Sequence, residues 1–228
     1  MIVPLTRQKF DQLVPLIATG PQYKYCWGKF SNFLQRLLIS VVAVAVILLV
    51  RTVFGLEFGT ILFLLGVAGA LFWLWYPAFQ ASVRNAKSRR YKYSGFFRGR
   101  ILDWWITDQL IGKQETVNSK GELVIVENRE KWINLEVGDD TGFSIELEAP
   151  LRPAHKVIAR GQIAEMIVMS NRPDLSSIEN FTEVYIPSHN LWVNDYPYIR
   201  KDFFNEVSSR LGQDRQQRPR RRRRQYDE

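Results

Sequence analysis

Two long apolar runs dominate the hydrophobic pattern and lie close together in the chain. The run "LLISVVAVAVILLV", Leu37–Val50, has fourteen apolar or small residues, and "FGTILFLLGVAGALFWLWYPAF", Phe58–Phe79, has twenty-two residues without a charge. A helix needs about 20 residues to cross the hydrocarbon core of a bilayer. The second run reaches that length alone, and the first reaches it with its apolar neighbours. Because only Gly55–Glu57 separates the runs, we predict an antiparallel transmembrane hairpin over residues 37–79.

The second run also carries signals for packing and for its own end. Gly66, Gly69 and Ala70 are small enough to let a neighbouring helix approach closely. Aromatic residues gather at the end of the run, as they do at membrane–water interfaces. Pro77 follows them and can end or kink the helix there.

Residues 1–36 show a different, amphipathic pattern. Phe10, Leu13, Val14 and Ile17 are spaced as on one face of a helix, and Thr6 is a candidate N-terminal cap. The stretch "YKYCWGKFSNF" then alternates aromatic residues with lysines, which is typical of the headgroup level of a membrane. We therefore predict an N-terminal segment that lies in the membrane interface, and a role of this segment in binding a partner is the open alternative.

After residue 100 the hydrophobic period changes from that of a helix to that of a strand. "INLEV" and "FSIELEA" alternate apolar and polar residues, and the turn cluster "GDDTG", Gly138–Gly142, separates them. Further strand candidates are "RILDWWI", "GELVIVE", two strands within "HKVIARGQIAEMIVMS", "FTEVYIP" and "LWVND". A helical period over residues 198–211 ends before Gly212.

Five to seven short strands with turns between them predict an α+β chain. The fold that we expect is a two-helix transmembrane hairpin, followed by a small β-barrel of the OB or SH3 type with a C-terminal helix and a disordered basic tail. The corresponding segments are the interfacial residues 1–36, the hairpin 37–79, a juxtamembrane collar 80–100, the β-rich domain 101–211 and the tail 212–228.

Charge is unevenly distributed along the chain and predicts an orientation. Residues 84–100 contain seven Lys or Arg and no acid, whereas residues 101–209 contain eighteen acids and ten Lys or Arg. Cations next to a membrane span stay on the cytoplasmic side. We therefore expect an integral protein of the inner or thylakoid membrane, with both termini in the cytoplasm or stroma. Candidate contacts to anionic lipid headgroups in the collar are Arg84, Lys87, Arg89, Arg90 and Lys92.

The C-terminal tail carries six arginines within Arg218–Arg224, whose mutual repulsion favours disorder. Three possibilities for the target of this tail remain open: it binds anionic lipid, it binds RNA or ribosomes, or it has no specific target. The arginines have no accompanying set of aromatic residues for base stacking, which argues against sequence-specific recognition of nucleic acid.

A search for catalytic chemistry yields no candidate. His155 and His189 lack the neighbours of a metal site, and Cys26 has no histidine near it in sequence that could activate it. Phosphate-binding and nucleophile motifs are missing from the sequence. We therefore predict a protein that is not an enzyme, with no catalytic, cofactor or metal residues.

Several segments resemble an uncharacterised family of two-helix membrane proteins of cyanobacteria and plastids. The resemblance is carried by "YKYSGFFRGRILD", "GELVIVENRE", "NLEVGDDTGF" and "EMIVMSNRPDLS" and is best over residues 90–200. The layout is also similar to that of photosystem assembly factors, which have a two-helix anchor and a stromal β-domain. The resemblance implies a membrane protein complex, plausibly photosynthetic, as partner, and it implies no active-site residues.

Two functional hypotheses follow. The first is a non-catalytic membrane adaptor or assembly factor that docks its β-domain onto a membrane protein complex, and the alternative is an accessory subunit of a transporter. Residues 186–204 are rich in the residue types that dominate protein interfaces. The candidate partner-binding residues are Trp192, Tyr196, Tyr198 and Arg200. The alternative for these aromatic residues is that they close the core of the β-domain against the C-terminal helix.

Overall fold

The structure is a computed structural model that describes residues 2–54, 59–117, 123–140 and 142–211. The chain forms two compact units. The first thirteen residues join the chain from Tyr91 onward in one unit, which we call the β unit, and Val14–Arg90 form the other, the helical unit. The predicted boundary at residue 36 therefore does not separate the units, and the basic tail 212–228 lies outside the described residues.

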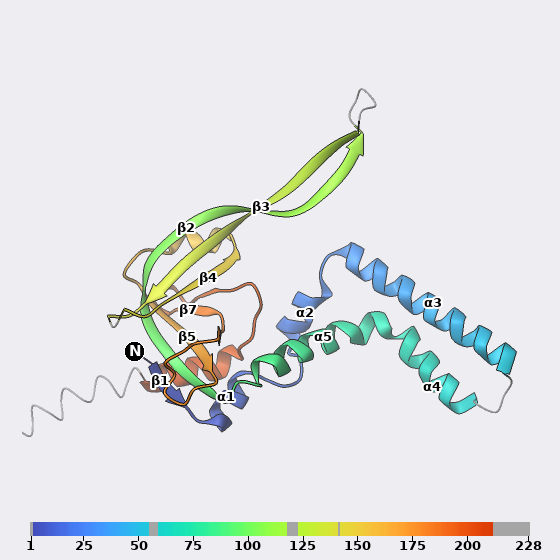
Figure 1. Cartoon of the computed structure of the whole chain (residues 1–228), viewed down its shortest axis with the longest axis horizontal. Helices are drawn as coiled ribbons and strands as arrows, with labels where there is room; N and C mark the ends of the chain where they lie inside the picture. The colour runs from blue at the N-terminus through green and yellow to red at the C-terminus, as the bar shows by residue number, and fades with distance from the viewer. Residues whose placement is uncertain (1, 55–58, 118–122, 141, 212–228) are drawn as a thin grey trace, which may run out of the picture. The chain divides into compact units, whose positions relative to one another are not determined.

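The β unit is built on one large antiparallel sheet with the strand order β4-β3-β2-β5-β7-β8 (Figure 1). Two further strands lie off this path, since β1 pairs with β2 and β6 pairs with β5. The strands are β1 Ile2–Leu5, β2 Tyr93–Val117, β3 Leu123–Gly138, β4 Ser144–Pro150, β5 Ile163–Ser170, β6 Asn180–Phe181, β7 Val184–Ile186 and β8 Leu191–Val193. Two short 3-10 helices, η2 Pro153–Val157 and η3 Pro187–His189, connect some of them.

The hairpin predicted from alternating residues is confirmed. β3 and β4 pair from Trp132↔Pro150 to Gly138↔Ser144, and the turn closes with a hydrogen bond from the Asp139 amide to the Phe143 carbonyl. Exposed and buried residues alternate along β4, as a strand with one solvated face requires. In this hairpin the local pattern and the three-dimensional pairing agree.

The predicted closed barrel is not what the described strands form. Their hydrogen-bonded order runs from β4 to β8 without closing, so the sheet keeps two edges. The long strand β2 carries irregularities at Leu102 and Ile111, where extra residues increase the local twist. In the segment "HKVI", expected as a strand, His155–Val157 instead form the end of η2, which begins at Pro153, and Ile158 is its C-cap. "RILDWWI" and "GELVIVE" are parts of much longer strands.

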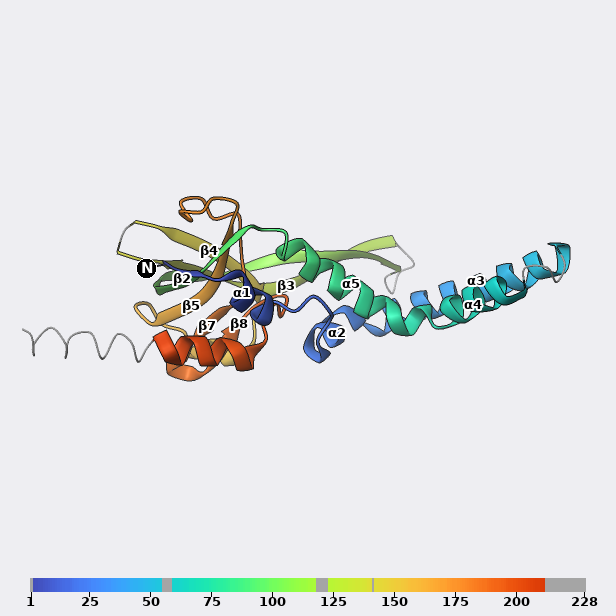
Figure 2. The same cartoon turned by 90° about the horizontal axis from the view of Figure 1, so that it is seen from below.

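One face of the sheet carries the main hydrophobic core, which includes Phe97, Leu135, Met166 and Val184. The other face is covered by a C-terminal helix over residues 201–211, beside β7 and β8 (Figure 2). Its Phe204 is fully buried. The ring of Phe204 contacts those of Phe96, Trp192 and Tyr185 at centroid distances of 5.3, 5.0 and 5.7 Å. The predicted C-terminal helix is therefore present and packs as a second layer.

The beginning of the chain belongs to the β unit and corrects the interfacial prediction for residues 2–13. β1 pairs with the first part of β2, and helix α1, Arg7–Leu13, follows it. Thr6 accepts a hydrogen bond from the Lys9 amide, as an N-cap does. Phe10 and Leu13 are buried, and the Leu13 carbonyl accepts the Arg200 amide at 2.9 Å. Phe10 and Leu13 of the predicted face thus pack within the β unit, whereas Val14 belongs to the helical unit and Ile17 is 77% exposed. The spacing alone does not distinguish a protein core from a membrane surface.

The helical unit consists of α2 Gly20–Trp27, α3 Phe30–Phe54, α4 Gly59–Ala70 and α5 Phe72–Ser88. Among the described residues, α3 is the one unbroken helix that is long and apolar enough to cross a membrane. Its 25 residues extend over about 37 Å at 1.5 Å each. A Cβ atom added at Gly69 would lie 3.1 Å from the Ala43 Cβ, so α4 approaches α3 closely at that glycine, as predicted from its small size. The predicted connection Gly55–Glu57 lies outside the described residues.

The second apolar run is not the single straight helix that its length predicted. α4 and α5 meet at an angle of 76° around Leu71 (Figure 1). Ser40 of α3 accepts the Trp73 amide at 3.2 Å, and the Trp75 indole donates to the Ala68 carbonyl at 2.8 Å. The break leaves the Trp73 amide and the Ala68 carbonyl without their usual partners within a continuous helix, and these two bonds replace those partners. α5 runs on through Pro77 and includes the first half of the basic collar.

Candidate protein-binding surface

The most exposed apolar part of the β unit is a two-stranded arm formed by residues 102–117 of β2 and 123–132 of β3. β5 pairs with β2 only from Tyr93 to Arg100, and β4 pairs with β3 only from Trp132 onward. Beyond these points the two strands pair with each other alone, and Figure 1 shows them continuing past the rest of the sheet. Both outer edges of the arm therefore present backbone donors and acceptors that no described strand uses.

The register of the arm places apolar side chains on both of its faces. On the face that continues the buried residues Ile133 and Leu135, the exposed fractions range from 38% for Trp104 to 70% for Leu123. The other apolar members of this face are Ile106, Leu110 and Ile125. The opposite face carries exposed Trp105, Val124 and Val126. The arm thus extends the hydrophobic face of the sheet to a region that no described element covers.

Polar side chains of the arm are largely matched to one another. Lys113 lies opposite Glu127, and Asp108 lies opposite Lys131, so the charges of neighbouring strands attract each other. Arg129 also bonds to Glu127 at 2.9 Å. The arm therefore offers apolar surface and free strand edges, which is the chemistry that recognises an extended peptide by strand addition.

At its base the arm is fixed to the sheet by polar contacts. Arg160 pairs with Asp103, and the Trp104 amide also donates to this carboxylate. Both bonds favour the ionised form, and the amide is the larger cause of the lowered pKa of Asp103. The Gln109 side chain donates to Glu148 of β4 at 2.8 Å. These contacts hold the first residues of the arm in line with the sheet.

The aromatic residues predicted as a docking patch are mostly packed inside the β unit. Trp192 is half-buried between Tyr185 and Phe204, and Tyr196 is 4% exposed and contacts the Tyr198 ring at 4.6 Å. Arg200 is exposed and lies over the ring of Phe203. This placement matches the alternative in which the aromatic residues close the core, and their role in binding a partner stays a prediction.

The predicted lipid-binding cations are divided between helix α5 and the chain that follows it. Arg84 lies 5.5 Å from the Tyr25 ring centroid, and Arg89 donates to the Val14 carbonyl at 3.2 Å. Lys87 and Arg90 are exposed in the helical unit, and Lys92 is exposed in the β unit. Two of the five cations thus have structural contacts, and the other three are open to solvent or ligands.

Sequence reasoning missed two buried carboxylates, Glu165 and Glu183, which are each 1% exposed. Burial raises the pKa of Glu165, against the opposing effects of a 2.6 Å bond from Ser208 and the charge of Arg98. Glu183 accepts the amides of Tyr198 and Ile199. The signal in the sequence was an isolated acid within an apolar strand, as in "EMIVMS". Protein donors therefore hold Glu183 and one oxygen of Glu165, and Arg98 lies 3.4 Å from the other oxygen of Glu165.

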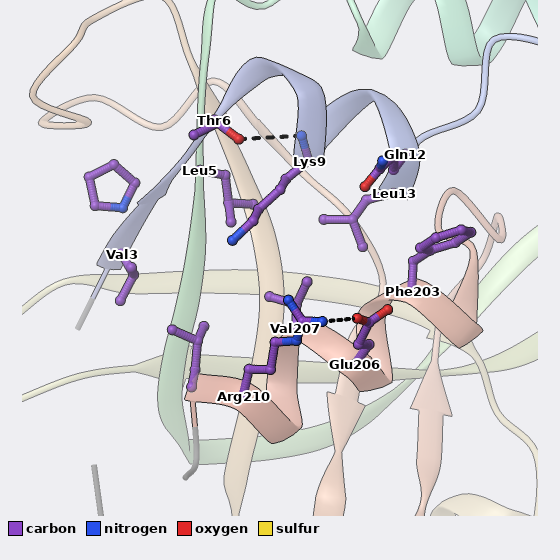
Figure 3. Close-up of a pocket in the computed structure, with 12 residues that line it drawn as sticks. Val3, Leu5, Thr6, Lys9, Gln12, Leu13, Phe203, Glu206, Val207 and Arg210 are labelled. Atoms are coloured by element: carbon purple, nitrogen blue, oxygen red, sulfur yellow. Dashed lines mark hydrogen bonds and ion pairs between the residues drawn. The ribbon is translucent and has the colours of Figure 1, made fainter. Parts of the chain in front are cut away.

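A cavity of about 230 Å³ lies in the β unit among β1, α1 and the C-terminal helix (Figure 3). Leu5, Leu13 and Val207 supply apolar walls, while Lys9 reaches from α1 toward the helix that carries Arg210. Arg210 is paired with Glu206. The cavity could hold a small amphipathic molecule, but it contains no nucleophile with a base beside it.

A metal site needs several His, Cys, Asp or Glu side chains arranged around one point. The residues that the structure describes contain no group of three or more such side chains placed to hold a metal ion. His155 is buried, and its Nδ1 accepts the Arg152 amide at 3.2 Å. Desolvation lowers the pKa of His155, and the charge of Arg152 adds to this effect. Its neutral ring therefore caps a 3-10 turn.

Comparison with protein families gives one match. A family model described as a family of unknown function (DUF8619) matches residues 3–218. No curated protein and no solved structure matches the chain. The match includes residues of both units, so the family relationship extends over nearly the whole chain.

Proposed function

We propose that this chain, which belongs to the DUF8619 family of unknown function, is a non-catalytic membrane-anchored adaptor whose β unit binds another protein. The helical unit anchors the chain, and the arm supplies the binding surface. The single observation that carries the proposal is the arm, with exposed apolar residues on both faces and two strand edges with which no described strand pairs.

The anchor follows from the apolar surface of the helical unit. α3 is long enough to cross a bilayer, and apolar side chains along it, such as Leu38, Val42 and Leu49, are more than half exposed. Such a surface is stable in hydrocarbon and costly in water. The lysines and arginines that flank the apolar runs favour a cytoplasmic position for both flanks.

The occupant that fits the arm best is an extended segment of a protein in the same membrane complex. A strand added to either edge satisfies the free backbone groups, and its alternate side chains pack on the apolar face. The matched charges on the arm leave little net attraction for a charged ligand. A two-stranded ribbon alone in water is only marginally stable, so a third strand also stabilises the arm itself.

The test is co-purification of the full-length chain in mild detergent, with the double variant Leu123→Lys and Ile125→Lys. Both side chains are more than 60% exposed, so the β unit should keep its fold while losing its partner. Val157→Lys is the matched control, because Val157 is 46% exposed in the β unit but lies outside the arm.

We expect the wild type and V157K to co-purify with the same partner subunits in equal amounts. The amount of partner recovered with the double variant should be at least tenfold lower. Equal recovery with all three chains would overturn the role of the arm. Recovery of the chain only with copies of itself would overturn the adaptor proposal, because the arm would then serve self-association.

A further inference from the structure

Helix α5 has one face that no described element of the helical unit covers. Leu71, at its N-cap, then Trp75, Phe79 and Val83 recur every fourth residue and are 38–56% exposed. This spacing places them along one side of the helix. They form a continuous strip, which we call the α5 strip.

The opposite face of α5 is already occupied by α2. The Asn85 amide donates to Gln22 of α2 at 2.8 Å, and Pro77, Ala81 and Asn85 are buried along this face of α5. Gln22 and Asn85 are fully buried there. α5 is therefore fixed in the helical unit by its polar side, with the α5 strip pointing away from α2.

Charge and geometry identify what the α5 strip meets. Residues 72–88 contain no acid, and Lys87 continues the four-residue series at its C-terminal end, followed by exposed Arg90. The apolar end of the strip is continuous with the apolar α4 through Leu71. An apolar strip that passes into cations, with Trp75 on it, has the composition of a helix at the surface of an anionic membrane.

The bend between α4 and α5 determines how α5 is oriented relative to the membrane. α5 turns from α4 by 76° at the level of Ser40 of α3, where Trp73 bonds to the Ser40 hydroxyl. When α4 points into the bilayer, α5 therefore runs nearly parallel to its surface. The 12 residues of α4 extend about 18 Å from that level.

We infer that α5 lies flat in the headgroup region of an anionic membrane, with the α5 strip at the acyl-chain boundary and Lys87 and Arg90 at the lipid phosphates. The second apolar run then enters the bilayer through α4 alone. The polar seam with α2 faces away from the lipid, which explains how buried Gln22 and Asn85 stand beside an apolar helix.

The experiment measures the depth of single labels in the full-length chain, reconstituted in vesicles of 70% phosphatidylcholine and 30% phosphatidylserine. Cys26→Ser removes the native thiol, and a fluorophore is attached to a cysteine at Leu71, Trp75, Phe79 or Val83. Lipids with quenchers at different depths report the position of each label. Val46→Cys in α3, which is 54% exposed, is the control for a deep position.

We expect the four labels on α5 to lie at a shallow depth that changes by no more than about 5 Å over the series, as a turn of 76° from α4 implies, and the label at position 46 to lie deeper. In a helix along the membrane normal, depth would instead change by about 6 Å with each label and by about 18 Å over the series. That gradient would overturn the inference, and so would labels that lipid quenchers do not reach.

A charge variant tests the lipid phosphates separately. Lys87→Glu with Arg90→Glu should reduce quenching of the Val83 label at least twofold in the vesicles with phosphatidylserine and leave the Leu71 label unchanged. If the Val83 label is quenched equally with and without the two cations, Lys87 and Arg90 do not bind the lipid phosphates, and that part of the inference is wrong.

Discussion

Glu183 allows a quantitative prediction, because its carboxylate is almost completely buried in the β unit. It accepts the backbone amides of Tyr198 and Ile199, both at 3.0 Å. These bonds, together with one from its own amide, favour the ionised form. Burial opposes them and is the larger effect, so the pKa of Glu183 rises from 4.5 to about 7.

The raised pKa makes the stability of the β unit depend on pH. Between about pH 4.5 and 7 the folded state binds a proton at Glu183 that the unfolded chain releases. The free energy of unfolding therefore falls as pH rises through this window and is constant above it. A shift of about 2.5 units at 1.36 kcal/mol each corresponds to about 3 kcal/mol. Glu183→Gln removes this titration and should make the slope shallower, while Glu165, whose pKa burial also raises, keeps its own contribution.

Hydrogen exchange of the amides in β5 and β7, corrected for the intrinsic pH dependence of exchange, measures this free energy in the full chain. Glu146→Gln is the matched control, since Glu146 is exposed on β4 and its removal changes the net charge equally. We expect the control to keep the wild-type slope. A slope in E183Q that equals the wild-type slope would refute the assignment to Glu183.

Two further predictions concern packing. Phe204→Ala removes a fully buried ring that contacts three other rings. It should lower the free energy of unfolding of the β unit by about 3–5 kcal/mol, measured by the same exchange experiment. A decrease below about 1 kcal/mol would contradict the position of Phe204 between helix and sheet. Gly69→Leu should separate α3 from α4, because even a Cβ there lies 3.1 Å from Ala43. Spin labels at Val46 and Leu64 would measure this as an increased distance, and an unchanged distance would contradict the close approach.

The elements that the sequence predicted correctly are those whose pattern depends on near neighbours. The β3–β4 hairpin follows from strict alternation and a turn cluster, and α3 follows from an uncharged run of helical length. The C-terminal helix follows from its four-residue period. In each of these, local preference and tertiary packing favour the same structure, so the sequence contains enough information.

Predictions failed where a partner distant in the sequence decides the structure. The break at Leu71 depends on Ser40, which is 31 residues away and accepts the Trp73 amide. Residues 2–5 join the sheet because β2, some 90 residues later, offers a free edge. The amphipathic spacing of α1 describes an apolar face correctly but does not specify what covers it, whether lipid or protein.

The arm is the clearest example of this limit, and it also strengthens the functional argument. "VIVEN" in β3 begins with three consecutive β-branched apolar residues, as buried strands often do, yet Ile125 is 61% exposed. A hydrophobic pattern predicts which side chains are stable only when buried. It does not indicate whether the same chain or another molecule buries them. Long apolar strands with free edges associate with other strands unless something occupies them. The described residues of this chain leave the arm uncovered, and this is the reason for our proposal that a strand of another membrane protein buries it.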